Sequence, residues 1–316
     1  MNGSLRLGAL DLCKTRDGRR HADVIWDTLD LVPKLEQLGY TRYWLAEHHN
    51  PEIAQSSPEI LIPILAGITD TIRVGAAGIL LRYHAPFKVA KDFRLLHAIF
   101  PHRIDLGLAR GGVPDLVREL LIDIGGNETP YEDKVAQLLG FLRGTGKTSA
   151  NPTGIAPPDV WLLGSKSISA ALAAHNGTSF CFARFLEAGD GDESCREAIS
   201  HYRDNFRSST HLPEPQWCVA VAGACASSER KAQLFAGGAA GQRIDGVVAN
   251  VIGDPEQCRS LFVEMSEKYA TSEFVFLDLC RTQSDRLESY RLLAEALNLR
   301  PRNLPRTSDF QRRSAG

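Results

Sequence analysis

Residues 38–49 read Leu38-Gly39-Tyr40-Thr41-Arg42-Tyr43-Trp44-Leu45-Ala46-Glu47-His48-His49. Gly39 is typical of a helix end, the apolar run Arg42–Glu47 predicts a strand, and polar side chains follow it directly. Upstream, Leu5–Asp11 predicts another strand, and Ala22–Leu38 carries apolar residues at helical spacing. This segment is therefore the second junction of a strand–helix–strand unit.

The same alternation continues along the rest of the chain. We expect further strands at 72–81, 103–110, 159–164, 179–183, 217–224 and 273–279, and helices at 58–69, 86–100, 167–175, 193–206, 255–269 and 285–297. Eight strands alternating with helices predict an α/β protein, a single (β/α)8 TIM barrel. A doubly wound open sheet would alternate in the same way, so periodicity alone does not show that the sheet closes.

Three segments do not fit the alternation: 111–157, 227–253 and 300–316. We interpret the first two as insertions after strands 4 and 7. The third is rich in arginine, and we expect a basic, disordered C-terminal tail there. Residues 1–299 then form one barrel domain, and without the three segments the chain approaches the roughly 250 residues of a typical barrel.

Composition excludes several classes of partner. The chain has 36 Lys and Arg against 38 Asp and Glu, a net charge of −2, so no bulk field attracts nucleic acid or anionic lipid. We find no signal peptide and no membrane span, which predicts a cytoplasmic protein. The seven cysteines are odd in number and contain no Cys-x-x-Cys pair, so we expect reduced thiols and no metal site.

In a barrel the functional groups stand at the mouth, the end where the carboxyl termini of the strands meet. Glu47, His48 and His49 lie at the end of the second strand. Two imidazoles beside a carboxylate can supply a base that titrates near neutral pH. A purely structural polar strand end is the alternative interpretation.

The ends of strands four and five predict an anion site. Arg110 precedes Gly111-Gly112, and the turn Gly164–Ser169, Gly-Ser-Lys-Ser-Ile-Ser, opens a helix. A guanidinium, hydroxyls and free backbone N–H groups at a helix N-terminus all favour a phosphate. Ordinary capping explains either feature alone, whereas both at one mouth would favour a phosphate-bearing cofactor.

Segment 38–49 resembles the second-strand signature of the bacterial luciferase-like flavin monooxygenases. The segments at 57–61, 72–81, 84–90, 100–110, 161–165 and 251–256 follow in that family's order and spacing. The resemblance implies a (β/α)8 barrel that uses FMN in its reduced form, supplied by a separate flavin reductase. Such an enzyme reacts with O2 and oxidises a small organic molecule, for example a secondary metabolite.

The resemblance also assigns catalytic and substrate residues. His48 matches the family's catalytic base, and Glu47 and His49 would orient it. Asp11 and Tyr83 would border the substrate pocket. All five lie at predicted strand ends.

The cofactor residues follow in the same way. Arg110, Ser165 and Ser169 match the family's phosphate contacts. Ala77 and Gly78 match the positions of a non-prolyl cis peptide under the isoalloxazine ring. Small side chains suit a place where backbone must approach a flat ring.

Two other functions stay open from the sequence. One is an O2-independent oxidoreductase that uses FMN or a deazaflavin. The other is a non-catalytic barrel subunit of a heterodimer, against which the presence of His48 and Arg110 argues. The family resemblance further implies a homodimer and a transient contact with the reductase.

Overall fold

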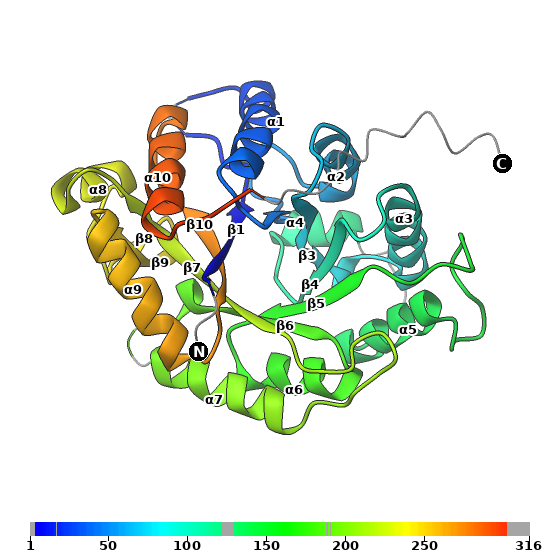
Figure 1. The fold of residues 1–316 in the computed structure, drawn as a ribbon. Helices are drawn as coiled ribbons and strands as arrows, with labels where there is room; N and C mark the ends of the chain where they lie inside the picture. Colours follow the sequence, from blue (N-terminus) through cyan, green and yellow to red (C-terminus); the bar gives the residue numbers. More distant parts are fainter. Residues whose placement is uncertain (1–3, 17, 122–128, 188, 190, 302–316) are drawn as a thin grey trace.

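A computed structural model describes residues 4–16, 18–121, 129–187, 189 and 191–301. Eight parallel strands form a closed ring, because β10 pairs with both β7 and β1 (Figure 1). This closure confirms the (β/α)8 barrel and excludes the open sheet. The ring strands are β1 (Arg6–Asp11), β2 (Arg42–Leu45), β3 (Arg73–Leu80), β4 (Ile104–Ala109), β5 (Asp159–Gly164), β6 (Ser179–Ala183), β7 (Trp217–Cys225) and β10 (Glu273–Asp278).

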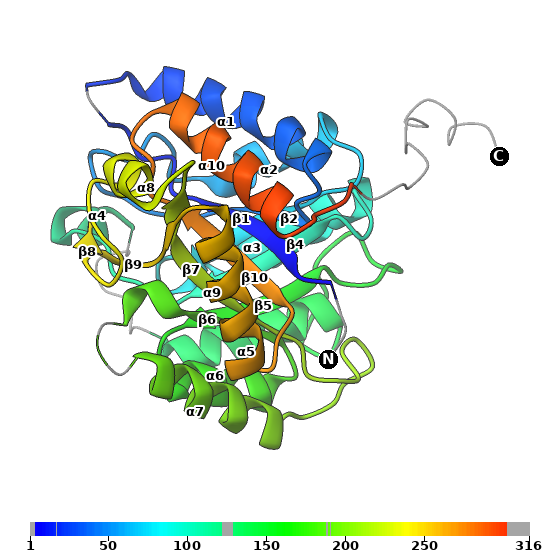
Figure 2. The same ribbon diagram turned by 60° about the vertical axis from the view of Figure 1, so that its left-hand side comes forward.

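Helices surround this ring on the outside (Figure 2). The predicted strands and helices lie within two residues of the observed bounds at each end. The short 3-10 turns η1 (Leu81–Tyr83) and η2 (Arg184–Leu186) follow β3 and β6. The surrounding helices are α1 (His21–Gln37), α2 (Pro58–Gly67), α3 (Pro86–Ile99), α5 (Tyr131–Arg143), α6 (Ser167–Asn176), α7 (Gly191–Asp204), α9 (Pro255–Lys268) and α10 (Gln283–Ala296).

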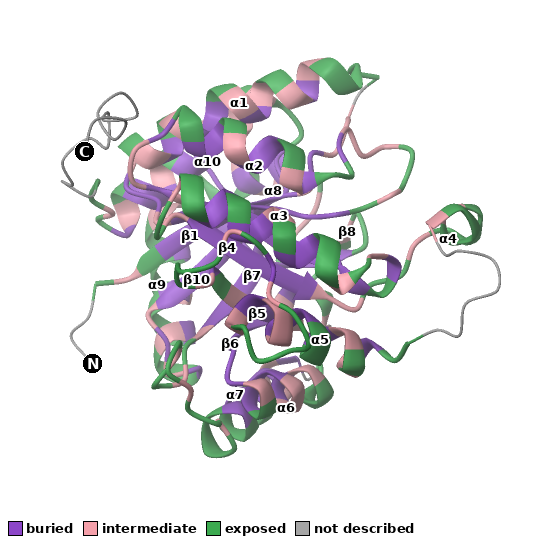
Figure 3. Ribbon diagram, turned by 90° about the vertical axis from the view of Figure 1, so that its right-hand side faces the viewer, coloured by how far each residue is buried: buried purple, intermediate pink, exposed green. Residues whose placement is uncertain are grey.

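Strand alternation divides the apolar core into two layers. In β2, Tyr43 and Leu45 belong to the layer between strands and helices, whereas Trp44 packs in the barrel interior. The strands consist mostly of buried residues, while the outer faces of the helices are exposed (Figure 3). Side chains therefore fill the interior, and groups at the strand ends are held on a rigid base.

A buried charge network fills the amino end of the interior. Arg42 pairs with Asp105 at 2.6 Å and also with Glu273. Its guanidinium lies 5.2 Å from the ring centroid of Trp44 and 4.7 Å from that of Trp161. The ion pairs and ring contacts compensate for the lost hydration of the guanidinium.

The two predicted insertions contain regular structure. Residues 111–157 hold α4 (Asp115–Leu121), which stands out from the barrel with none of its residues buried, and also α5, which covers the barrel (Figure 3). Residues 227–253 hold α8 (Glu229–Ala236), β8 (Arg243–Ile244) and β9 (Val247–Gly253).

The strands β8 and β9 lie outside the ring. β9 runs parallel to β7, and β8 pairs antiparallel with β9. Asp245 and Gly246 join β8 to β9 with φ angles of 51° and 88°, the left-handed conformation that a tight two-residue hairpin requires. The tip of this hairpin reaches the β1 side of the mouth, where Lys14 pairs with Asp245.

Three other predictions concern the chain as a whole. All seven cysteines are buried with free thiols. In the part of the chain that the structure describes, no helix combines the length and the apolar character needed to cross a membrane. The tail predicted at 300–316 lies outside the described residues, except for Arg300 and Pro301.

Candidate functional site

Glu47 connects the ends of β2 and β3 at the mouth. Its buried carboxylate lies 2.9 Å from Nε2 of His49 and 2.8 Å from Nε2 of His84, both measured to Oε1. Its Oε2 accepts the backbone N–H of Leu80 at 2.8 Å. His84 was not among the predicted site residues, because strand periodicity does not show that the turn after β3 faces β2.

These contacts determine the charges of the cluster. Burial by itself would raise the pKa of Glu47, but hydrogen bonds with His84, His49 and Leu80 lower it overall. The hydrogen bond to Glu47 raises the pKa of His84. Glu47 and His84 therefore form an ion pair over a wider pH range than free side chains would.

His48 has a different environment from His49. It is exposed at the mouth, while His49 is partly buried against Glu47. The surrounding protein displaces water from the imidazolium and lowers the pKa of His48, and the charge of Glu47 opposes this effect. A neutral, accessible imidazole can accept a proton at neutral pH.

The two residues predicted to border a substrate lie in different surroundings. Tyr83 is buried in η1, next to His84. The Asp11 carboxylate accepts hydrogen bonds from Thr28 of α1 at 3.1 Å and from Tyr43 of β2, and pairs with Arg286 of α10 at 3.3 Å. Asp11 is thus directed toward the helices outside the ring, and contact of either residue with a substrate stays a prediction.

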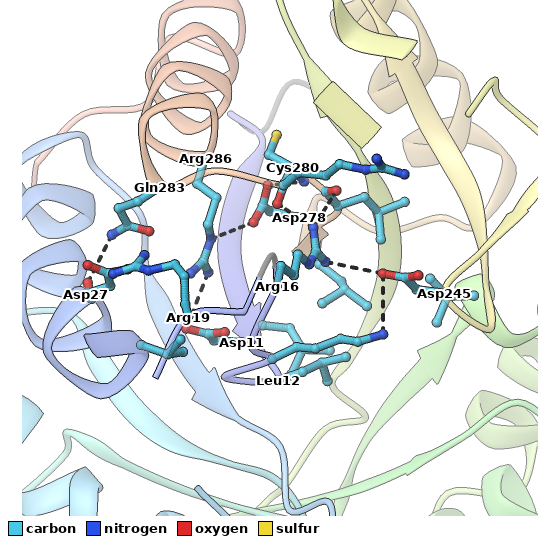
Figure 4. Close-up of a pocket in the computed structure, with 17 residues that line it drawn as sticks. Asp11, Leu12, Arg16, Arg19, Asp27, Asp245, Asp278, Cys280, Gln283 and Arg286 are labelled. Carbon is cyan, nitrogen blue, oxygen red and sulfur yellow. Dashed lines mark hydrogen bonds and ion pairs between the residues drawn. The ribbon is translucent and has the colours of Figure 1, made fainter. Parts of the chain in front are cut away.

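The end of β10 repeats the arrangement at Asp11. Each strand finishes in Asp-Leu-Cys, and the N–H groups of Cys13 and Cys280 donate to Asp11 and Asp278 respectively, each at 2.8 Å. Arg286 bridges the two turns, because its Nε donates to Asp278 at 2.6 Å (Figure 4). Burial would raise the pKa of Asp11, but the charge of Arg286 and the hydrogen bonds lower it overall. The repeated Asp-Leu-Cys tripeptide is the sequence signal that could have identified this cluster.

The peptide bond between Ala77 and Gly78 is cis, at the position that the family resemblance assigned. Ala77 is buried in the interior layer. A Cβ atom on Gly78 would lie 2.8 Å from the backbone nitrogen of Ala109, so the approach of β4 requires glycine here.

The ends of β4 and β5 bring the predicted anion-binding groups to adjacent strands, since Leu108 of β4 pairs with Leu162 of β5. Arg110 follows β4, and its guanidinium lies 5.1 Å from the ring centroid of Tyr131. It forms an ion pair with Glu132, in the first turn of α5.

The turn Gly164–Ser169 leads into α6, whose N-terminus receives no side-chain cap. A Cβ on Gly164 would lie 2.2 Å from Oγ of Ser169, so glycine permits this serine to pack against the turn. A hydrogen bond from Ser165 lowers the pKa of Glu187, whose carboxylate also lies 3.4 Å from Nζ of Lys166. Carboxylates thus pair with several of the donors that suit a phosphate.

This donor set fits a phosphate monoester. It combines a partly exposed guanidinium, two hydroxyls and an uncapped helix N-terminus. Sequence reasoning did not predict the roles of Glu132 and Glu187, because their positions depend on how α5 and η2 pack. Within the described ranges, no group of three His, Cys, Asp or Glu side chains could hold a metal ion.

A closed ring of eight parallel strands with polar groups at their carboxyl ends is the architecture of a (β/α)8-barrel enzyme. The chain belongs to the luciferase-like monooxygenase family, whose model matches residues 6–236.

Curated relatives cover nearly the whole chain. The chain is 32% identical to the uncharacterized protein YwcH of Bacillus subtilis, over 92% of this chain and 98% of YwcH. It is also 32% identical to the N-acetyl-S-alkylcysteine monooxygenase of the same organism, over 84% of this chain and 81% of the relative.

Solved structures share the fold. The structure of apo-MsnO8 superposes with a TM-score of 0.84 at 28% identity, over 95% of this chain and 99% of the other. The oxygenating constituent of 3,6-diketocamphane monooxygenase from Pseudomonas putida, in complex with FMN, has a TM-score of 0.73 at 16% identity, over 96% and 99%. An F420-dependent secondary alcohol dehydrogenase has a TM-score of 0.67 at 12% identity, over 93% and 99%. The last two likenesses establish the fold alone.

Proposed function

We propose that this protein is a flavin-dependent monooxygenase that uses reduced FMN and O2 to oxidise a small organic molecule. The observation that supports this most directly is the donor set at the ends of β4 and β5. In this reaction reduced FMN supplies two electrons, one atom of O2 enters the substrate, and the other leaves as water.

Arg110, Ser165 and Ser169 would hold the FMN phosphate. The Arg110 guanidinium, now paired with Glu132, would be available to the phosphate, and the two hydroxyls and the α6 N-terminus would supply further donors. Ala77 and Gly78 would lie under the isoalloxazine ring.

His48 would act as the base at the mouth. Its imidazole is accessible and its pKa is lowered, so the neutral form is available to accept a proton. Glu47 would hold this segment in place through His49 and His84. Glu47 and His49 would thus position the segment, and His48 would carry out the proton transfer.

The proposal includes partners outside the chain. A separate flavin reductase would supply reduced FMN in the cytoplasm through transient contact. We propose a homodimer formed through the apolar face of α2 and α3, defined by the exposed residues Ile60, Ile64, Ile68, Leu95 and Ile99.

Hydride transfer to or from a deazaflavin is the second candidate, because an F420-dependent dehydrogenase has the same fold. The name of one relative, N-acetyl-S-alkylcysteine monooxygenase, gives a first class of substrate to assay. The thioether N-acetyl-S-benzylcysteine is a suitable member of that class.

The test is an anaerobic titration with oxidised FMN, reduced FMN and reduced F420. We expect reduced FMN to bind, and Arg110→Ala to weaken it at least about tenfold, because a charge-assisted hydrogen bond is worth about 1.5–3 kcal/mol. Arg291→Ala, at an exposed residue of α10, is the matched control and should not change the affinity. Binding of F420 alone, with turnover in the absence of O2, would favour the second candidate, and no binding of any of the three would contradict both.

A further inference from the structure

A small cavity lies at the mouth between the ends of β1 and β10. Leu10, Leu12, Leu277 and Leu279 form its apolar wall, and the tip of the β8–β9 hairpin covers it. Its volume is about 60 Å³, more than the roughly 10–15 Å³ that a single water molecule requires. It can hold one end group of a ligand but not a whole substrate.

Charges are distributed unevenly around this cavity. On the helix side, Arg286 pairs with two carboxylates, Asp11 and Asp278 (Figure 4). Both carboxylates also accept a backbone N–H group. Farther along the same side, Arg19 pairs with Asp27. These carboxylates are engaged in the scaffold and have no excess of positive charge next to them.

On the mouth side the cations outnumber the carboxylates. Lys14 and Arg16 share Asp245, at 3.4 and 3.8 Å. Arg281 also lines the cavity, but its guanidinium lies against Gly237 at the end of α8, where a Cβ atom would be 2.5 Å from Nη2. Two cations therefore share one carboxylate. We call the part of the cavity lined by Lys14, Arg16 and Asp245 the carboxylate cavity.

Burial strengthens this imbalance. The Lys14 and Arg16 side chains are 23% and 20% exposed, whereas that of their shared partner Asp245 is 47% exposed. Partly desolvated cations with an incomplete set of counter-ions attract a further anion. Asp245 stands on a tight turn, and its carboxylate shows which chemical group these cations accept.

The position of the cavity is matched to the proposed cofactor site. In the ring order β1-β2-β3-β4-β5-β6-β7-β10, β1 lies opposite β5 and β10 lies opposite β4. The proposed phosphate site at β4 and β5 therefore lies across the mouth from the carboxylate cavity. A substrate held at the mouth between these two sites would reach the carboxylate cavity.

We propose that the carboxylate cavity binds the carboxylate of an organic acid substrate, and that Asp245 occupies this position when no substrate is bound. The statement that this acid is a substrate rests on the proposed monooxygenase function, whereas binding of the acid does not require the cofactor. Lys14 would make the main ionic contact. Arg16 has a second duty, because its Nη1 donates to the carbonyl of Leu279 at 2.8 Å and to that of Cys280.

The test compares N-acetyl-S-benzylcysteine with its uncharged methyl ester, by calorimetry on flavin-free protein and on protein with reduced FMN under anaerobic conditions. We expect the acid to bind more tightly than the ester. Lys14→Gln should weaken binding of the acid about tenfold, which corresponds to one lost ionic hydrogen bond. It should not affect binding of the ester.

Asp245→Asn provides the decisive comparison. Removal of the competing carboxylate should strengthen binding of the acid, opposite in direction to Lys14→Gln, although both variants disrupt the same ion pair. Arg291→Gln, with the same change in net charge as Lys14→Gln, is the control and should have no effect.

Equal binding of acid and ester, or the same direction of change in Asp245→Asn and Lys14→Gln, would overturn the proposal. So would the absence of charge-dependent binding across this acid, benzoate and hexanoate compared with their amides. If reduced FMN does not bind but the acid does, the proposed monooxygenase function is wrong, whereas the proposed binding of a carboxylate in this cavity is supported.

Discussion

At the scale of single residues, the Glu47–His84 ion pair depends on pH in a defined direction. The pKa of His84 is raised, so its contribution to stability is complete below the unfolded value of about 6.5 and is lost as the pH rises through the folded value. The pKa of Glu47 is lowered, so its contribution is present above about 4.3 and is lost as the pH falls through its folded value. The pair therefore stabilises the fold most between about pH 4.3 and 6.5.

We predict that His84→Gln reduces the free energy of unfolding more at pH 5.5 than at pH 8.5, because only at the lower pH is the wild-type pair fully charged. Urea denaturation of both proteins at the two pH values measures this difference. His175→Gln, at an exposed residue of α6, is the control and should show no such dependence. An equal loss at both pH values would mean that His84 acts only through packing.

At the scale of elements, the turns after β1 and β10 depend on one guanidinium. Arg286 comes from α10 and joins Asp11 to Asp278, both buried. Without it, two carboxylates would stay in a dry environment with no positive partner, a situation that is strongly destabilising.

Arg286→Met should therefore lower the free energy of unfolding by about 3 kcal/mol or more at pH 7.5. Urea denaturation followed by circular dichroism measures this loss, and the added substitution Asp278→Asn should recover part of it. Arg291→Met, which breaks an exposed pair with Glu295, should cost less than about 0.5 kcal/mol. A loss below about 1 kcal/mol in Arg286→Met would show that water, and not Arg286, solvates these carboxylates.

The same elements show what the sequence could predict. All eight ring strands were predicted because each is a short apolar run, and polar residues or glycine follow most of them directly, such as Glu47 after β2. Segment 247–253 was missed as a strand because β8 has only two residues and β9 pairs with the far half of β7. Asp245-Gly246, a known hairpin signal, was present and could have identified the turn.

The site was harder to predict than the fold. Glu47, His48, Arg110 and Ser165 were predicted because each stands at a strand end or a helix start. Contacts such as Glu47 with His84 depend on the packing of neighbouring loops, which local periodicity does not encode. Whether these residues bind flavin and substrate stays a prediction for the titrations above.

At the scale of the whole molecule, two adjacent helices carry exposed apolar residues. Ile60 and Ile64 lie four residues apart on α2, Ile68 directly follows this helix, and Leu95 and Ile99 lie four residues apart on α3. Exposed apolar patches of this kind on soluble proteins commonly mark interfaces. Two copies that meet through this face would bury all five side chains.

Ile64→Arg should convert a dimer into a monomer, because a guanidinium at the centre of that face would be buried without a partner. Light scattering after size-exclusion chromatography gives the molar mass, which we expect to be twice 34.7 kDa for the wild type and 34.7 kDa for the variant. Leu234→Arg, on the exposed side of α8, should leave the mass unchanged. A wild-type monomer would contradict the homodimer.

The buried network around Arg42 determines from which end compounds enter the barrel. Because these side chains fill the amino end of the interior, any compound that reaches the interior arrives from the mouth. Cofactor, substrate, oxygen and product would then all pass through the mouth of the barrel. The compound that binds deepest in the barrel would have to enter first and leave last. The order of binding would then follow from the depth of each site and would not require a loop that opens and closes.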